Sequence, residues 1–230
     1  MKFHSSWLER MSSCCKLVSG ARPPVSAPAP LPTGTTNSRA SRTAAILVAL
    51  CNRNDQASLL FTVRSSTVGS HKGQVSFPGG HMNPGETPNE AAHRETYEEL
   101  GLSTGPIQTI GFLSALPAIT GTMVSPVVGF IEKDVGDLSH FTPDKMEVAK
   151  IFTRTIEELQ NSKTHEVLSR NGKSMTMPVF ASKDGLEDER IWGFTAYVTN
   201  LVLMKIIIPS SIDPSITPTS IDPSTLIDPS

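Results

Sequence analysis

The sequence has few cysteines, and this excludes two common kinds of scaffold. Cys14, Cys15 and Cys51 are the only ones among 230 residues, and their spacing fits no zinc pattern. An odd count in a chain of this length also gives no disulfide framework. A reducing compartment is therefore the expected setting.

A concentrated positive charge is missing as well. The formal net charge is −2 at pH 7, and lysine and arginine are not gathered in any one stretch of the middle of the chain. This argues against non-specific nucleic-acid binding through a basic face. We therefore expect no nucleic-acid partner.

The chain also has no run of about 18 apolar residues that would predict a membrane span. The best candidate, residues 194–208, is interrupted by polar residues. We interpret it as a buried amphipathic helix. No membrane partner is expected. The N-terminus lacks the apolar core of a secretory signal, and the last three residues, Asp-Pro-Ser, are not the peroxisomal Ser-Lys-Leu address.

The two ends of the chain differ in composition from its middle. Residues 1–43 hold several prolines and many serines without apolar periodicity, and residues 209–230 repeat Ile-Asp-Pro-Ser three times. Proline blocks helix and strand, and the C-terminal repeat is also poor in large apolar groups, so both ends are predicted to be disordered. Residues 44–208 suit one domain with one core.

The N-terminal segment carries one sorting cue. Up to Thr43 it has six basic residues against a single acid, Glu9. This composition suits a mitochondrial transit peptide. The alternative is a generic disordered extension on a cytosolic protein.

Apolar runs of strand length predict the order of elements. Residues 44–50 and 58–64 are predicted strands, with turn residues at 52–55 between them. Further strands are expected at 73–77, 107–115, 122–131, 148–153 and 176–180, and helices at 155–161 and 194–206. Mixed strands with helices between and after them predict an α/β sandwich.

The strongest end signals belong to a helix over residues 88–100. Thr87 can cap it, Pro88 fits its first position, Glu90 completes a capping box, and Gly101 can end it.

On this helix Glu95, Glu98 and Glu99 stand at i, i+3 and i+4, so their carboxylates share one face. Each like-charge pair at this spacing lowers helix stability by about 0.2–0.5 kcal/mol. A hard divalent cation bound between the carboxylates would make the same arrangement favourable. A solvated acidic face without function is the alternative. Arg94 can bridge to an acid on a folded-back loop, for which Glu86 is the nearest, and Gly79-Gly80 permit a close backbone approach.

The spacing of these residues is similar to a known signature, G-x5-E-x7-R-E-U-x-E-E-x-G-U, in which U is a bulky apolar residue. The matching positions are Gly80, Glu86, Arg94, Glu95, Glu98, Glu99, Gly101 and Leu102. Thr96 departs from the pattern at one apolar position, where its methyl group can still pack inward. The chain therefore resembles the Nudix hydrolases.

This resemblance implies a mixed β-sheet sandwiched between helices and a hydrolysis that depends on Mg²⁺ or Mn²⁺. The substrate is implied to be a nucleoside diphosphate linked to another group. Glu95 and Glu99 would be the principal metal ligands and Glu98 a further one, while Arg94 would hold Glu86. One of these glutamates, or one outside the motif, would orient or deprotonate the attacking water.

Residues 59–80 are also similar to the signature of the coenzyme A pyrophosphatase branch of this family. Residues 77–80 (Phe-Pro-Gly-Gly) match in register, and so do Leu60, Thr62, Arg64, Ser65 and Gly73. Gly69 departs from it by replacing a second arginine.

The resemblance implies hydrolysis of coenzyme A or acyl-coenzyme A to 3′,5′-ADP and a 4′-phosphopantetheine product. Arg64, Lys72 and His71, beside Gly79-Gly80, would contact substrate phosphate. Alternatives are another nucleoside diphosphate derivative or dinucleotide as substrate, or a non-catalytic binding module.

Two further residues are open to two interpretations. Glu147 could be a ligand or base from another loop, although a surface acid in a salt bridge is the simpler reading. Trp192 is expected in the core rather than as an adenine platform. The oligomeric state does not follow from the sequence.

Overall fold

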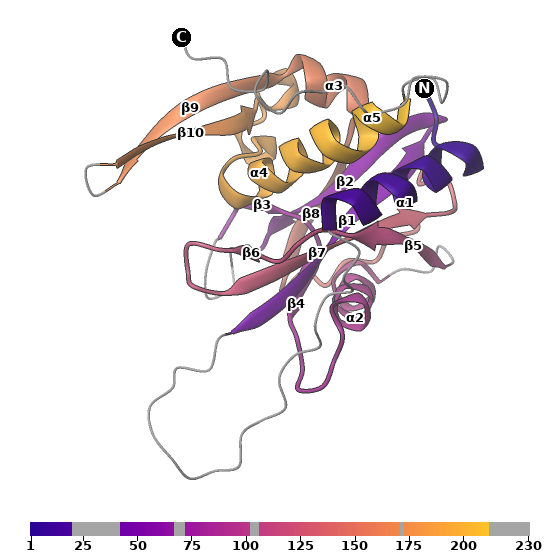
Figure 1. Ribbon diagram of the computed structural model, residues 1–230, viewed down its shortest axis with the longest axis horizontal. Coiled ribbons are helices and arrows are strands. Elements are labelled where there is room, and N and C mark those ends of the chain that lie inside the picture. Colours follow the sequence, from indigo (N-terminus) through magenta and orange to yellow (C-terminus); the bar gives the residue numbers. More distant parts are fainter. Residues whose placement is uncertain (20–41, 67–71, 102–105, 171–172, 212–230) are drawn as a thin grey trace.

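A mixed β-sheet forms the middle layer of the computed structural model, which describes residues 1–19, 42–66, 72–101, 106–170 and 173–211 (Figure 1). Its strands are β1 (Thr43–Arg53), β2 (Gln56–Arg64), β3 (Val75–Ser76), β4 (Gly79–His81), β5 (Ile107–Phe112), β6 (Leu116–Pro117), β7 (Met123–Ile131) and β8 (Val148–Thr155). The order is β3-β2-β1-β7-β5, with β4 paired to β1, β6 to β7 and β8 to β2.

The central strand β1 is buried along most of its length, and it pairs in parallel with β7 and antiparallel with β2. A strand covered on both faces reads as a continuous apolar run, which is why its sequence shows no alternation. The turn into β2 places Asn54 and Asp55 at φ 49° and 61°. These positive values match a two-residue hairpin turn.

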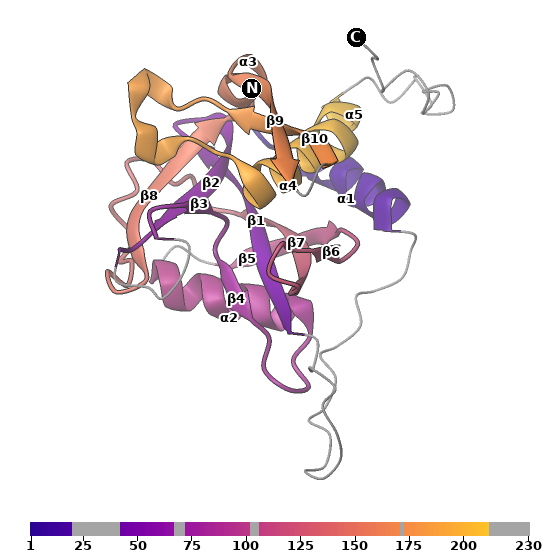
Figure 2. The same cartoon turned by 90° about the vertical axis from the view of Figure 1, so that its left-hand side faces the viewer.

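Helices cover both faces of the sheet. Figure 2 shows α2 (Pro88–Leu100) on one side and α1 (Ser5–Ser19) with α4 (Gly193–Val202) on the other. The short helix α3 (Ile156–Asn161) follows β8, and α4 continues through a π-helical segment, Leu203–Ile207, into α5 (Ile208–Ser211). The predicted sandwich of a mixed sheet between helices is confirmed.

The prediction that residues 1–43 form a disordered leader is wrong for its first part. α1 buries Trp7, Leu8, Met11 and Cys15 against the sheet. These residues stand at i, i+1, i+4 and i+8, which is one face of a helix. The prediction used the average composition of residues 1–43, which is rich in serine and proline. This average does not show the short amphipathic stretch at its start. Residues 20–41 lie outside the described part of the chain.

Side-chain hydrogen bonds join the N-terminal segment to the rest of the domain. The Asn52 side chain accepts from the backbone N–H of Phe3 at 2.8 Å and donates to its carbonyl at 3.0 Å. Trp7 Nε1 donates to Ser210 Oγ at 2.7 Å, and Arg10 Nε donates to the Ser210 carbonyl at the same distance. The predicted tail therefore begins too early, because Ser210 belongs to the domain. Residues 212–230 lie outside the described part.

The long helical segment at the C-terminus is a core element. Gly193–Ser211 has the length and apolar composition of a membrane span, but half of its most apolar window is buried in the domain. Thr195, Ala196 and Val202 are among its buried residues. This agrees with the expected buried amphipathic helix.

A two-stranded ribbon extends from the domain (Figure 1). It consists of β9 (Lys163–Arg170) and β10 (Lys173–Phe180). Only residues 176–180 were expected as a strand, because the outer part of the ribbon is exposed and its sequence carries no pattern of burial.

Candidate active site

The helix α2 is held at both ends by the predicted hydrogen bonds. The backbone N–H of Glu90 donates to Thr87 Oγ1 at 3.2 Å, and the N–H of Thr87 donates to the Glu90 carboxylate at 2.8 Å. Gly101 ends the helix in the left-handed conformation, with φ 57°. Because both ends are fixed, the place of each acidic residue along the helix is defined.

Arg94 ties the loop that precedes α2 to the helix itself. Its Nε and Nη2 donate to the two carboxylate oxygens of Glu86 at 2.7 and 2.9 Å. Nη2 also donates to the His81 carbonyl at 3.1 Å. This two-point ion pair holds the pKa of Glu86 below its ordinary value. The predicted contact between Arg94 and Glu86 is therefore present.

The Arg94 guanidinium also donates hydrogen bonds to two glutamates of α2. Its Nη1 donates to Glu95 at 2.9 Å and to Glu98 at 3.1 Å. The Glu98 side chain is 61% exposed, whereas that of Glu95 is 17% exposed. The three carboxylates expected at one metal site thus have unequal surroundings, and Glu98 lies on the solvent side.

Glu99 is nearly inaccessible to solvent. It is 4% exposed, and its carboxylate accepts from the backbone N–H of Gly79 at 3.1 Å. Burial raises its pKa to about 7, against the opposing effects of that N–H and of the Arg64 guanidinium. Burial also raises the pKa of Glu95, against the opposing effect of Arg94. Both ionised forms would gain from a nearby cation.

Two glycines let β4 pass between β1 and α2. A Cβ on Gly79 would lie 2.3 Å from the Ala45 carbonyl oxygen, and one on Gly80 would lie 2.4 Å from Cδ of Glu95. Gly79 also has a φ of 146°, which side chains rarely adopt. The glycine pair therefore brings backbone directly against the buried carboxylates.

Glu95 and Glu99 supply the carboxylate oxygens that a hard divalent cation prefers as ligands. In the described part of the chain, no group of three or more His, Cys, Asp or Glu side chains is arranged to hold a metal. Arg94 donates hydrogen bonds to Glu95 and Glu98 in this arrangement. Mg²⁺, however, commonly binds through one or two protein carboxylates and completes its octahedron with water and substrate phosphate.

Glu147 lies close to this pair of acids. Its charge contributes to the raised pKa values of both Glu95 and Glu99. The backbone explains the proximity, because the N–H of Ser65 donates to the Glu147 carbonyl at 2.8 Å. Glu147 is exposed, but it stands beside the acidic site rather than on a remote surface, and only the fold reveals this.

Two of the predicted phosphate-binding residues, Arg64 and Lys72, lie at or beside the end of β2. Arg64 Nε is buried and has no hydrogen-bond partner among the described residues. The carbonyl of Arg64 accepts from the N–H of Gly73 at 3.0 Å, which places the exposed Lys72 beside the strand end. His71 and Gly69 lie outside the described residues.

Trp192 departs from its prediction as a core residue. It is 44% exposed, whereas the other tryptophan, Trp7, is 2% exposed. The apolar character of a tryptophan does not by itself show which of the two side chains is buried.

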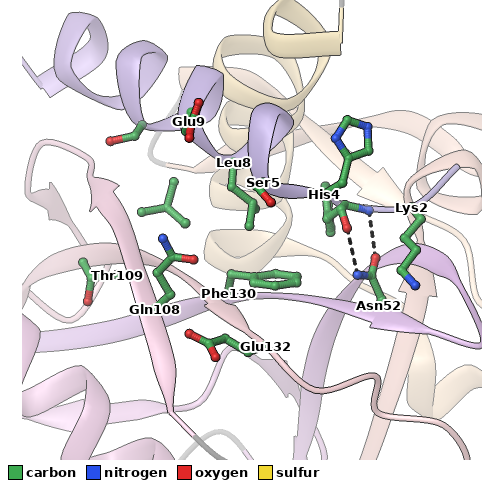
Figure 3. A pocket seen from close by; sticks show the side chains of 13 residues that line it. Lys2, His4, Ser5, Leu8, Glu9, Asn52, Gln108, Thr109, Phe130 and Glu132 are labelled. Carbon is green, nitrogen blue, oxygen red and sulfur yellow. Dashed lines mark hydrogen bonds between the residues drawn. The ribbon is translucent and has the colours of Figure 1, made fainter.

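A cavity of ≈ 540 Å³ lies on the other side of the sheet (Figure 3). Phe3 and Leu8 from the N-terminal segment line it, opposite Gln108, Ile110 and Phe130 of the sheet. Its lining, as far as the structure describes it, contains none of the predicted site residues. The cavity therefore belongs to the junction between α1 and the sheet.

A comparison with protein-family models identifies a NUDIX domain over residues 41–171. The chain is 31% identical to Nudix hydrolase 3 of Caenorhabditis elegans, over 73% of this chain and 74% of that protein. It is 36% identical to the mitochondrial coenzyme A diphosphatase NUDT8 of Mus musculus, over 75% and 81%. It is 31% identical to the uncharacterized Nudix hydrolase NudL of Enterobacter sp. (strain 638), over 72% and 83%.

Among solved structures, the chain resembles a MutT/nudix family protein from Enterococcus faecalis. The TM-score is 0.44 at 15% identity, and the match covers 79% of this chain and 70% of that one. Members of this family typically use a divalent metal ion and act on small nucleotide derivatives. The chain belongs to the Nudix hydrolase family and is a pyrophosphohydrolase.

Proposed function

We propose that this enzyme hydrolyses the pyrophosphate of coenzyme A or acyl-coenzyme A. The products are 3′,5′-ADP and 4′-phosphopantetheine, or its acylated form. The observation that carries this proposal is Arg64, whose buried Nε has no hydrogen-bond partner in the described residues and whose charge acts on Glu99. The coenzyme A diphosphatase of Mus musculus, at 36% identity, supports the choice of substrate.

In this proposal Glu95 and Glu99 would hold Mg²⁺ or Mn²⁺, with Glu98 as a further ligand. When bound there, such an ion would supply charge neutralisation for the phosphates and a lower pKa for a bound water. Arg94 and Glu86 keep the loop closed against α2, so that Gly79 and Gly80 stay against the carboxylates. A glutamate of α2, or Glu147 beside it, orients or deprotonates the attacking water.

The cations at the end of β2 bind the substrate. Coenzyme A carries a 3′-phosphate in addition to its pyrophosphate, so it presents more negative charge than ADP-ribose does. Arg64 can bind phosphate through two parallel hydrogen bonds, which are strong and directional. Lys72 adds an exposed positive charge, and His71 stands next to it in the sequence.

A second substrate class has one observation in its favour. Gly69 stands where the coenzyme A signature has an arginine, so one expected phosphate contact is missing. A dinucleotide or another nucleoside diphosphate derivative needs fewer cations. This reading keeps the same metal site and the same bond cleavage.

A substrate panel tests the proposal. Purified protein with Mg²⁺ is incubated with coenzyme A, acetyl-coenzyme A, ADP-ribose, NADH and diadenosine polyphosphates, and the products are separated by chromatography. We expect 3′,5′-ADP to form from coenzyme A with the highest kcat/KM of the panel. Repeating the assay with Mn²⁺ in place of Mg²⁺ identifies the ion that gives the higher activity. Preferential turnover of ADP-ribose or a dinucleotide would reject coenzyme A and favour the second class.

We also propose that the protein acts in mitochondria. The basic composition of residues 1–43 and the relative from Mus musculus named as mitochondrial support this. The docked helix α1 is a structural part of the domain and does not by itself determine the compartment.

A further inference from the structure

The turn that precedes β8, residues 144–147, is attached to both sides of the acidic site. The backbone N–H of Asp144 donates to the Glu99 carbonyl at 3.1 Å, at the end of α2. At the other end of the turn, the Glu147 carbonyl accepts from the N–H of Ser65 at 2.8 Å. The residue after Glu147 pairs with Arg64 of β2. The turn therefore bridges the end of α2 and the end of β2.

Hydrogen bonds within the turn fix the path of its backbone. The N–H of Met146 donates to Asp144 Oδ1 at 2.8 Å, and the N–H of Glu147 donates to the Asp144 carbonyl at 3.0 Å. A bond between the first and fourth residues closes a β-turn, so Lys145 and Met146 are its two central residues. The position of Met146 relative to the site is therefore set by the backbone.

Met146 adds an apolar surface to the edge of a charged site. It is 65% exposed. The next residue, Glu147, is close enough for its charge to contribute to the raised pKa values of Glu95 and Glu99. A methionine side chain is flexible and polarizable, and it adapts to apolar groups of irregular shape. Because the neighbouring groups are carboxylates and the Arg64 guanidinium, Met146 differs from them in the kind of ligand group that it can contact.

Coenzyme A carries an apolar group close to its pyrophosphate. On the pantetheine side, the second carbon after the phosphate ester oxygen bears a pair of methyl groups. ADP-ribose and dinucleotides have a polar ribose at the corresponding place. A pyrophosphate bound at Glu95 and Glu99 would bring the methyl groups to the edge of the acidic site, where Met146 lies.

We propose that Met146 contacts the pantetheine side of the substrate at these methyl groups, and so favours coenzyme A over nucleotides with a sugar in their place. This inference rests on the proposed function and deepens it, because it names a residue that recognises the half of coenzyme A without the nucleoside. Met146 determines substrate preference in this proposal and takes no part in the bond cleavage.

Kinetics with matched variants tests this role. Met146→Gln keeps the length of the side chain but makes its end polar, so KM for coenzyme A should rise about threefold or more, with a smaller change in kcat. KM for ADP-ribose should stay the same, and Met146→Leu should retain most of the affinity for coenzyme A. Met175→Gln is the control, because Met175 is 61% exposed on the ribbon that extends from the domain (Figure 1). An unchanged KM for coenzyme A in Met146→Gln, or an equal rise in Met175→Gln, would overturn the inference.

Binding of the two products provides a test that needs no turnover. Titration calorimetry with Mg²⁺ gives the Kd of 4′-phosphopantetheine and of 3′,5′-ADP. Met146→Gln should raise the first Kd about threefold or more and leave the second almost unchanged. Equal weakening of both products, or no binding of 4′-phosphopantetheine to the wild type, contradicts the proposed contact. If the variant weakens only 4′-phosphopantetheine while the wild type does not hydrolyse coenzyme A, the inference stands and the proposed function fails.

Discussion

At the scale of single residues, Glu99 combines burial with negative charge. In the metal-free protein its pKa is raised to about 7 from an ordinary value of 4.5. The folded state therefore binds this proton more tightly than the unfolded state does. Its ionisation costs stability as pH rises from about 4.5 to about 7, and below that range the cost is absent.

Glu99→Gln should therefore stabilise the metal-free protein at neutral pH while it disables the enzyme. We expect the free energy of unfolding at pH 8 to rise by on the order of 1–3 kcal/mol, with little difference near pH 4.5. Activity should fall by orders of magnitude, because a proposed metal ligand is lost. Denaturant titrations in EDTA at both pH values, together with turnover assays, measure the two effects.

Glu98→Gln is the matched control, since the Glu98 side chain is 61% exposed. It should change the free energy of unfolding in EDTA by less than about 1 kcal/mol, because an ion pair at an exposed site contributes little. Wild-type turnover in Glu99→Gln would reject the assignment of Glu99 to the metal.

Arg64 tests substrate choice with a pair of substrates that differ by one phosphate. Arg64→Ala should raise KM for coenzyme A by about tenfold or more, because a hydrogen bond between charged groups contributes about 1.5–3 kcal/mol. Dephospho-coenzyme A lacks the 3′-phosphate, so its KM should rise less. Arg64→Lys keeps the charge but loses the paired hydrogen bonds. Its KM for coenzyme A should therefore lie between that of the wild type and that of Arg64→Ala. Equal losses on both substrates would show that Arg64 does not select coenzyme A.

At the scale of elements, α1 behaves as part of the core. Met11 is fully buried between this helix and the sheet. Met11→Ala should lower the free energy of unfolding by about 2–5 kcal/mol through lost burial and the cavity left behind. Leu17→Ala, on the same helix but 75% exposed, should change it by less than about 0.5 kcal/mol. Similar small effects in urea titrations of both variants would show that α1 is not docked in solution.

The contrast between α2 and α1 shows how far the sequence predicts this fold. The ends of α2 follow from Thr87, Glu90 and Gly101, whose hydrogen bonds are local, so the helix and its acidic face were predictable. The site depends on non-local contacts as well. The Gly79 N–H reaches Glu99 across 20 residues, and Ser65 brings in Glu147. The motif implies Glu99 as a metal ligand, and the sequence leaves Glu147 open between a ligand or base and a surface acid.

Elements that depend on distant partners were missed for the same reason. Trp7 and Met11 have a helical spacing, but only a sheet face completed elsewhere in the chain turns it into a docked helix. β9 lacks a buried face over most of its length, so no periodic signal marks it. Trp192 is 44% exposed, which no local sequence pattern encodes.

At the scale of the whole molecule, sorting can be tested with reporters. A fluorescent protein fused after residue 43 should enter mitochondria, because the segment is basic and its helix is amphipathic. Changing Arg10, Lys16 and Arg22 to Glu should prevent entry. Microscopy with a mitochondrial marker and fractionation measure the result. A diffuse cytosolic signal from the unchanged leader would reject the mitochondrial proposal.

The docking of α1 has a consequence for timing. The face of α1 that holds Trp7, Leu8 and Met11 is buried once the domain is folded. A receptor that binds an apolar helix face could therefore bind it only on a chain that has not yet folded. Folding and delivery would then compete for one surface, and the faster process would decide where each molecule ends up. In the mitochondrial proposal, slower folding would send more of the protein across the membrane, and a ligand that stabilises the fold would leave more of it behind.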